Sequence, residues 1–272
     1  MESGLELESE YDNRARVPEH LDIIAGWQRD STQYRGIAKM ETKTYGPAPR
    51  NDYDFFHSAD SSAVEKPLIV FIHGGYWRSL SKDLFSHMAS GLNKVGYDVV
   101  MPNYTLCPET DIAGICKEME LFSQHLTKTY KRPLLITGHS AGGHLAAWLC
   151  QKDTLARTGS DVIGGFGISG IYDLKPMLQT SMNKDFKLDI ESAAASSPFL
   201  EEPQKDIIFD AWVGGNESGE FTRQSEMFAA SWHTQGASTT FIEIASANHF
   251  TAIEPLTNAD SLMVKRIVGL AS

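Results

Sequence analysis

Short apolar runs recur along the chain and are separated by longer amphipathic stretches. Runs rich in β-branched and aromatic residues, bounded by turn-forming residues, predict strands. These runs lie at residues 53–57, 68–72, 98–101, 134–137, 162–168, 207–213 and 240–245. Several, such as 68–72 (LIVFI), are apolar at every position, which is typical of parallel strands covered by helices on both faces.

The stretches between these runs predict helices at 80–95, 112–130, 141–151 and 221–235, and a late one at 258–268. The alternation of strand and helix predicts an α/β fold with a mostly parallel, doubly wound sheet flanked by helices. At 272 residues, 42% of them hydrophobic, the chain can form one such domain over residues 1–272.

Two segments interrupt this alternation. Residues 1–45 are polar and predict an N-terminal extension that is helical or irregular. Residues 174–205 lie between two predicted strands and are too long for a simple crossover helix. They are a candidate cap or lid insertion, since long insertions in compact domains often serve function, but an ordinary irregular excursion fits equally well.

Charge and cysteine content narrow the class of protein. A net charge of −11 and a pI near 5.3 argue against binding nucleic acid or an anionic membrane, because both reward clustered Lys and Arg. The acidic N-terminus is unlike a secretory signal, and no apolar stretch approaches the ~18 residues that span a bilayer. Cys107, Cys116 and Cys150 are an odd number in such a chain, so we expect reduced thiols in a cytoplasmic protein.

The strongest local signal is the apolar run 134–137, which leads into G-x-S-x-G at 138–142 and then into a small-residue helix. In such a nucleophile elbow Gly138 and Gly142 are required because the sharp turn brings the flanking backbone close. The turn would present the Ser140 hydroxyl at the N-terminus of a helix, where negative charge is favoured. Ser140 is therefore the predicted nucleophile of a serine hydrolase.

A second glycine-rich motif, HGGYW at 73–77, follows the apolar run 68–72. It corresponds to the H-G-G type of oxyanion loop found upstream of the elbow in lipases and esterases. We expect the oxyanion hole to be formed by the backbone around Gly74, Gly75 and Tyr76, joined by the N–H of Ala141. A Gly-Gly turn beside buried aromatic residues is the plainer alternative.

Among nine histidines, chain order selects the general base. In this fold the triad follows the order Ser, acid, His, so only His233 and His249 lie far enough downstream of Ser140. His233 falls within a predicted helix, whereas His249 follows a predicted strand on a late loop. His249 is therefore the predicted base.

The triad acid is less sharply defined. Glu217 lies on the loop directly after the predicted strand 207–213, where ligand sites of open α/β sheets gather. Asp210 is disfavoured because it lies within that strand. Asp173, which also suits a helix cap, and Glu220 remain open as alternatives to Glu217.

Other histidines have plainer roles. We expect His144 to occupy a buried polar position rather than to bind metal, and His73 to support the oxyanion loop. The chain has no Walker loop and no C-x-x-C pair, so it implies no cofactor and no metal.

Together these motifs resemble a known family, the kynurenine formamidases, also called arylformamidases, within the α/β-hydrolase superfamily. The resemblance is carried by HGGYW at 73–77, GHSAGGH at 138–144, VGGNESGEF at 213–221, EYDN at 10–13 and YG at 45–46. The family often has Asp where this chain has Glu217, and Glu is an accepted triad acid in the fold.

The resemblance implies hydrolysis of N-formyl-L-kynurenine to L-kynurenine and formate, in tryptophan catabolism, through a formyl-Ser140 intermediate. Tyr76 and Trp77 are expected to bind substrate, by narrowing the acyl side and stacking on the aryl ring. The expected partner is a small molecule, an aryl formamide, and homodimer formation is left open. A carboxylesterase acting on small acyl esters, or a noncatalytic binding scaffold, would carry the same fold.

Overall fold

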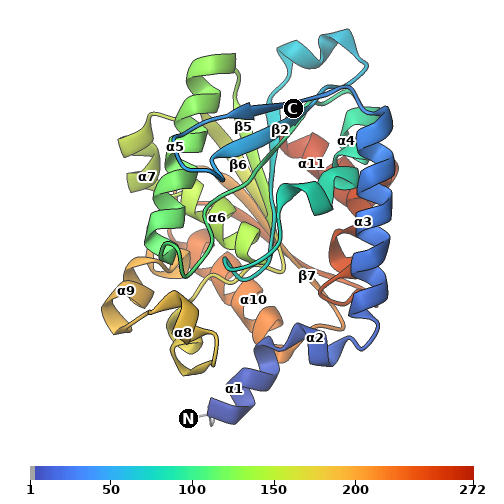
Figure 1. Ribbon diagram of the computed structural model, residues 1–272. Coiled ribbons are helices and arrows are strands. Elements are labelled where there is room, and N and C mark those ends of the chain that lie inside the picture. The colour runs from blue at the N-terminus through green and yellow to red at the C-terminus, as the bar shows by residue number, and fades with distance from the viewer. Residues whose placement is uncertain (1–3) are drawn as a thin grey trace.

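The computed structural model describes residues 4–272, and these residues contain a single eight-stranded sheet (Figure 1). Its strands are β1 Met40–Thr44, β2 Asp52–Phe56, β3 Leu68–Ile72, β4 Val99–Pro102, β5 Leu134–His139, β6 Val162–Ile168, β7 Ile208–Gly214 and β8 Ser238–Ile244. They lie in the order β1-β2-β4-β3-β5-β6-β7-β8. Strands β3 to β8 pair in parallel, and β1 and β2 are antiparallel. The predicted α/β fold class is confirmed.

Helices connect the strands. The α-helices are α1 Gly4–Tyr11, α2 Asn13–Arg16, α3 His20–Ile37, α4 Ser90–Lys94, α5 Ile112–Tyr130, α6 Ala141–Leu149, α7 Lys152–Thr158, α8 Asn183–Phe186, α9 Ile190–Ala195, α10 Gly219–Thr234 and α11 Leu262–Leu270. Short 3-10 helices are η1 Ser61–Glu65, η2 Lys82–Ala89, η3 Lys175–Gln179, η4 Pro198–Leu200 and η5 Thr251–Thr257.

Two hydrophobic cores cover the two faces of the sheet. On one face α5, α6 and α10 contribute buried side chains such as Phe122, Leu145 and Trp232. On the other face α3, η2, α4 and α11 contribute residues such as Trp27 and Phe85. Figure 1 shows α5 and α7 on one side of the strands and α3, α4 and α11 on the other. Because both faces are covered, β3 is buried and apolar throughout, as its sequence indicated.

Helix α5 shows how the sequence specifies such an element. The Asp111 side chain caps it by accepting the N–H of Gly114, and Lys131 ends it in a left-handed conformation. Its buried residues recur every three or four positions, which directs one stripe of the helix at the core.

The N-terminal segment is more regular than expected. Residues 1–45 were predicted as an extension, but β1 at their end pairs with β2 and forms the edge of the sheet. The sequence of β1, METKT, gives no apolar run because an edge strand of this kind remains largely exposed. The predicted helix at 80–95 is divided into η2 and α4.

Residues 174–205 form four short helices, η3, α8, α9 and η4. Their buried residues include Met177 and Phe186. The N–H of Leu174 donates to the Ser197 hydroxyl over 2.8 Å, which ties the two ends of the segment together. The short helices of this segment thus pack against the rest of the domain.

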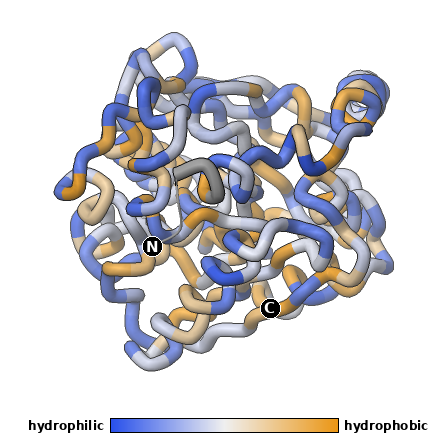
Figure 2. Tube along the Cα trace, turned by 90° about the horizontal axis from the view of Figure 1, so that it is seen from below, coloured by the Kyte–Doolittle hydropathy of each residue, from blue (hydrophilic) through white to orange (hydrophobic). Residues whose placement is uncertain are grey.

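Two further observations concern the molecule as a whole. Cys107, Cys116 and Cys150 are free and buried, and burial raises the pKa of the Cys107 thiol to about 12. Within residues 4–272 no helix combines the length and apolarity needed to cross a bilayer. Viewed from the end where α1 and α2 lie, hydrophilic and hydrophobic positions are interspersed along the trace (Figure 2).

Candidate active site

The turn between β5 and α6 holds Ser140 in a strained conformation. Its φ of 56° and ψ of −119° are unusual for a residue with a side chain. The turn passes so close to β3 that a Cβ built on Gly142 would lie 1.9 Å from the carbonyl oxygen of Ile72. Ser140 is the N-cap of α6, so its hydroxyl lies beside first-turn N–H groups that have no partner within the helix.

The loop after β3 lies against this elbow. A Cβ built on Gly74 would lie 3.0 Å from the Cβ of Ser140. The next three residues, Gly75, Tyr76 and Trp77, all have positive φ, of 114°, 50° and 54°. Turns of this kind gather successive backbone N–H groups into a concavity that suits an anion. The loop therefore sets a potential anion site next to the Ser140 hydroxyl.

His249 and Glu217 form a buried pair at the ends of neighbouring strands. The Nδ1 of His249 lies 2.6 Å from Oε2 of Glu217. The other carboxylate oxygen accepts the Ser169 hydroxyl and, at 2.7 Å, the N–H of Gly214. Because a carboxylate can only accept, Nδ1 carries the proton and Nε2 is left as the basic nitrogen.

His139, immediately before the nucleophile, supports this pair. Its Nε2 donates to the carbonyl oxygen of His249 over 2.9 Å, and the two rings lie 4.7 Å apart. Burial, and then the neighbouring His249, lower the pKa of His139 well below its usual range. A neutral His139 adds no positive charge beside the candidate base.

Two other histidines near the site are also buried and neutral. His144 donates from Nε2 to the carbonyl of Ser196 over 2.7 Å, and burial lowers its pKa to about 4. The Nδ1 of His73 lies 2.7 Å from the Gly74 carbonyl, and burial lowers its pKa to about 3. Residues 4–272 hold no cluster of three or more His, Cys, Asp or Glu that could hold a metal ion.

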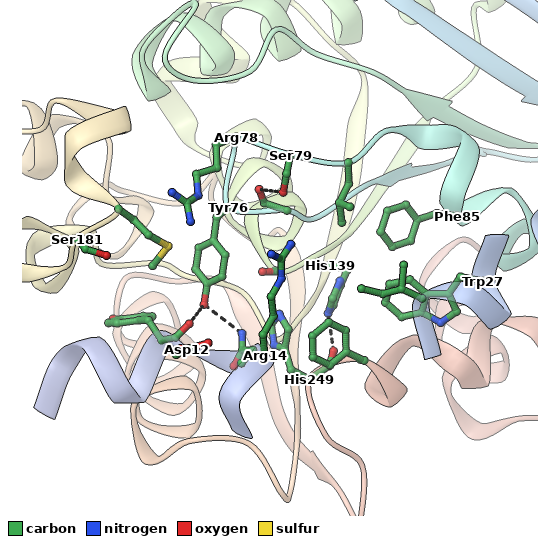
Figure 3. A pocket seen from close by; sticks show the side chains of 18 of the residues that line it. Asp12, Arg14, Trp27, Tyr76, Arg78, Ser79, Phe85, His139, Ser181 and His249 are labelled. Atoms are coloured by element: carbon green, nitrogen blue, oxygen red, sulfur yellow. Dashed lines mark hydrogen bonds between the residues drawn. The ribbon is translucent and has the colours of Figure 1, made fainter. Parts of the chain in front are cut away.

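Ser140 and His249 open into a cavity of about 260 Å³. Figure 3 shows labelled side chains from several elements converging on it. The loop after β3 contributes Gly75, Tyr76, Arg78, Ser79 and Leu80. Helix α3 contributes Ile24 and Trp27, and the insertion at residues 174–205 contributes Ser181 and Met182. A further set, Glu8, Tyr11, Asp12, Asn13 and Arg14, comes from α1 and α2 and is called the N-terminal wall below.

Side-chain hydrogen bonds hold the N-terminal wall in place. The Tyr11 hydroxyl donates to Glu220 of α10 over 2.7 Å and accepts from Gln224 over 2.7 Å. The Tyr76 hydroxyl donates to the Tyr11 carbonyl over 2.6 Å and accepts from Asn13 over 3.1 Å. The wall therefore touches both α10 and the loop beside the nucleophile.

The wall also contacts the insertion. Both the N–H and the hydroxyl of Ser181 donate to the carboxylate of Glu8, each over 2.6 Å. Two segments that lie outside the sheet, α1 and residues 174–205, thus close the cavity together.

Comparison with known proteins supplies the family. A family model described as an α/β hydrolase fold matches residues 69–252. Kynurenine formamidase of Danio rerio is 32% identical over 83% of this chain and 80% of its own length. That of Salmo salar is 32% identical over 87% of this chain and 84% of its own length. The chain belongs to the kynurenine formamidase family of α/β hydrolases.

A solved structure agrees with this membership in fold. A protein from a Silicibacter species, described as a candidate thioesterase, matches with a TM-score of 0.88 at 32% identity, over 97% of this chain and 99% of that one. The matches to the kynurenine formamidase relatives and to this structure each extend over most of the chain.

The structure brings most of the sequence-predicted site residues of this family member together. Ser140, Gly75, Tyr76 and His249 line one cavity. Glu217 contacts His249 from behind. Gly74 and Ala141 flank Ser140, in the loop and at the first position of α6.

Trp77 is placed differently from our expectation. It is fully buried and packs edge-on against His144 and Phe186, with ring centroids 5.0 and 5.7 Å away. Its left-handed backbone turns the indole into the core rather than into the cavity. The expected stacking of Trp77 on a substrate ring is therefore wrong, and Trp77 instead supports the loop from behind.

The alternative acids have other partners. Asp173 accepts the N–H of Lys175 over 3.0 Å, in the turn that leads into η3. Burial would raise the pKa of Glu220, but hydrogen bonds from Arg223, Tyr11 and Gln224 outweigh it and lower the pKa overall. Both carboxylates are thus occupied away from His249.

The sequence did not predict the N-terminal wall, nor that Ser181 and Met182 line the cavity. No periodicity or motif linked residues 8–14 to Ser140. The available signal was the EYDN run at 10–13, which the resemblance already included. That run contains Asp12, the N-cap of α2, whose side chain accepts the N–H of Ala15.

Proposed function

We propose that this chain hydrolyses N-formyl-L-kynurenine to L-kynurenine and formate, a step of tryptophan catabolism in the cytoplasm. The observation that carries the proposal is the joint placement of the Ser140 elbow, the His249–Glu217 pair and the loop of positive φ at one cavity. The names of the 32% identical relatives supply the substrate.

In the first half-reaction Ser140 Oγ attacks the formyl carbon while Nε2 of His249 accepts its proton. Glu217 stabilises the imidazolium that forms, because it faces Nδ1 at 2.6 Å. The N–H groups of Ala141 and of the loop at Gly75 and Tyr76 would hold the developing oxyanion, at roughly 3–4 kcal/mol for each donor.

The tetrahedral intermediate then collapses. The C–N bond breaks, and protonated His249 gives its proton to the departing aniline nitrogen, which leaves formyl-Ser140. In the second half-reaction His249 takes a proton from water as the water attacks the formyl carbon. Protonated His249 then returns its proton to Ser140 as formic acid leaves and ionises to formate, so no metal or cofactor enters the balance.

The side chain beside the nucleophile favours a small acyl group in the cavity of about 260 Å³. Tyr76 borders it beside the nucleophile, and its hydroxyl is held by Tyr11 and Asn13. Since a pocket distinguishes one methylene by about 10–200-fold, formyl should be preferred over acetyl to that extent.

Steady-state kinetics test the proposal directly. We expect kcat/KM for N-formylkynurenine to exceed that for N-acetylkynurenine and for p-nitrophenyl esters of butyrate or longer acids. Higher kcat/KM for the longer esters, with negligible hydrolysis of the formamide, would overturn it.

A second candidate function is hydrolysis of small acyl esters or thioesters. The specific observation in its favour is the candidate thioesterase fold that matches with a TM-score of 0.88 at 32% identity. The same substrate panel, extended with acetyl and butyryl thioesters, ranks the two functions.

A further inference from the structure

The charged residues that line the cavity balance one another. Among the described lining residues there are two acids, Glu8 and Asp12, and two arginines, Arg14 and Arg78. The chain as a whole has a net charge of −11, so a cavity lined by equal numbers of acids and arginines differs from the acidic average of the molecule. It suits a ligand that carries both charges rather than a neutral ester or a simple anion.

Two of these four groups already have partners. The Glu8 carboxylate accepts twice from Ser181, and Arg78 forms an ion pair with Asp185 at 2.7 Å. Within residues 4–272 the Arg14 guanidinium makes no hydrogen bond or ion pair. Asp12 uses Oδ1 to accept the N–H of Ala15 at 3.0 Å, which leaves Oδ2 for another donor.

The backbone that carries Arg14 and Asp12 is held over the cavity. Between them Asn13 is buried and donates to the Tyr76 hydroxyl. Figure 3 shows the Arg14 side chain running up between Tyr76 and His139, with Asp12 below the Tyr76 ring. A ligand attached at Ser140 therefore has a cation and an anion within the same cavity wall.

We propose that Arg14 and Asp12 form the subsite for a zwitterionic α-amino-acid group, with Arg14 binding the carboxylate and Asp12 the ammonium. This deepens the proposed function and rests on it, because L-kynurenine carries such a group at the end remote from its formamide. The planar guanidinium can bind a carboxylate through two parallel N–H donors. The Asp12 carboxylate accepts from the ammonium.

The size of the effect follows from exposure. Both side chains are exposed in the absence of ligand, so water and salt screen their charges. A hydrogen bond to a charged group in this setting corresponds to about a tenfold change in KM, and less at high salt.

Three substrates separate the contributions: N-formylkynurenine, its analogue without the amino group, and formanilide, which lacks both charges. For Arg14→Gln we expect KM to rise about tenfold for the first two, with kcat little changed, and no change in kcat/KM for formanilide. For Asp12→Asn, which keeps the cap of α2, we expect the rise only for N-formylkynurenine.

The matched control is Arg29→Gln, which removes the same charge from an exposed residue of α3 that pairs with Asp30. It should leave all three substrates unchanged. An equal loss on formanilide in Arg14→Gln would overturn the subsite by showing a general effect on the reaction. Unchanged KM for N-formylkynurenine in Arg14→Gln would overturn it as well.

Failure of the proposed function has a different signature. In that case the unmodified protein itself would hydrolyse esters or formanilide while leaving N-formylkynurenine intact. Failure of the subsite alone would leave N-formylkynurenine a good substrate whose KM is insensitive to Arg14 and Asp12.

Discussion

The floor and the N-terminal wall of the cavity are held by different means. The floor, with Ser140 and the loop after β3, is fixed by backbone that passes within contact distance of neighbouring strands. The wall is held by side-chain hydrogen bonds to α10, to Tyr76 and to Ser181. We infer that the floor supplies the chemistry and the wall supplies recognition, so damage to each should have a distinct kinetic signature.

The largest effect should come from Ser140→Ala. It removes the candidate nucleophile from a rigid elbow, so we expect kcat/KM for N-formylkynurenine to fall by at least about 10³-fold while the unfolding transition stays in place. Labelling by a fluorophosphonate probe should disappear with the activity. Retention of more than a few per cent of the rate would show that another group attacks the substrate.

The second largest effect should come from Glu217→Gln. It keeps the shape of the loop and removes the charge that faces His249, so we expect kcat to fall about 10²–10⁴-fold. Asp173→Asn is the matched control, because the Asp173 side chain accepts from Lys175 in the turn before η3, away from His249, and the change should affect kcat little. If Asp173→Asn proved the more damaging change, the acid would have to be sought one strand earlier.

Acid should destabilise the folded chain through three buried histidines near the floor. His73, His139 and His144 have pKa values lowered by burial, so between about pH 6.5 and 4 the unfolded chain binds protons that the folded chain excludes. Stability therefore falls as pH falls through this window, by up to about 1.4 kcal/mol per pH unit for each histidine.

Urea unfolding at several pH values measures this slope. His144→Gln should reduce the slope by up to about one proton, whatever its effect on absolute stability. His233→Gln, a change at an exposed residue of α10, provides the surface control. Equal slopes in all three proteins would mean that His144 titrates alike when folded and unfolded.

The smallest effect should come from the wall itself. Tyr11→Phe leaves the Glu220 carboxylate and the Gln224 amide with one partner fewer, which should cost about 1–3 kcal/mol of stability and raise KM severalfold. Tyr34→Phe removes a comparable hydroxyl, bonded to Asn93 away from the cavity. It should lose stability without a change in KM, and a matching rise in KM would remove the distinction between the two positions.

The positions of the candidate site residues could be predicted from the sequence where the determinants are local. The elbow and the glycine-rich loop are short motifs next to apolar strands, and Glu217 and His249 follow strands whose ends meet at one edge of the sheet. The strand β1 was missed because an exposed edge strand carries no apolar run. Trp77 was misplaced because its direction depends on a left-handed backbone that the motif does not reveal.

The wall could not be predicted because its contacts are remote in sequence. Tyr11 meets Glu220 across 209 positions, and Ser181 meets Glu8 across 173. Each of these residues is an ordinary polar position in its own segment. Only the folded arrangement of α1, α10 and the insertion brings them to Ser140.

The contact between Gly142 and Ile72 has an evolutionary consequence. With 1.9 Å from a built Cβ to a backbone oxygen, no side chain can be tolerated there without moving β3, so the elbow has no room to vary. The wall and insertion carry no such restriction at Arg14 or Met182, which reach the same cavity. Libraries that randomise those positions should therefore recover altered substrate range, whereas libraries at Gly142 should yield misfolded protein.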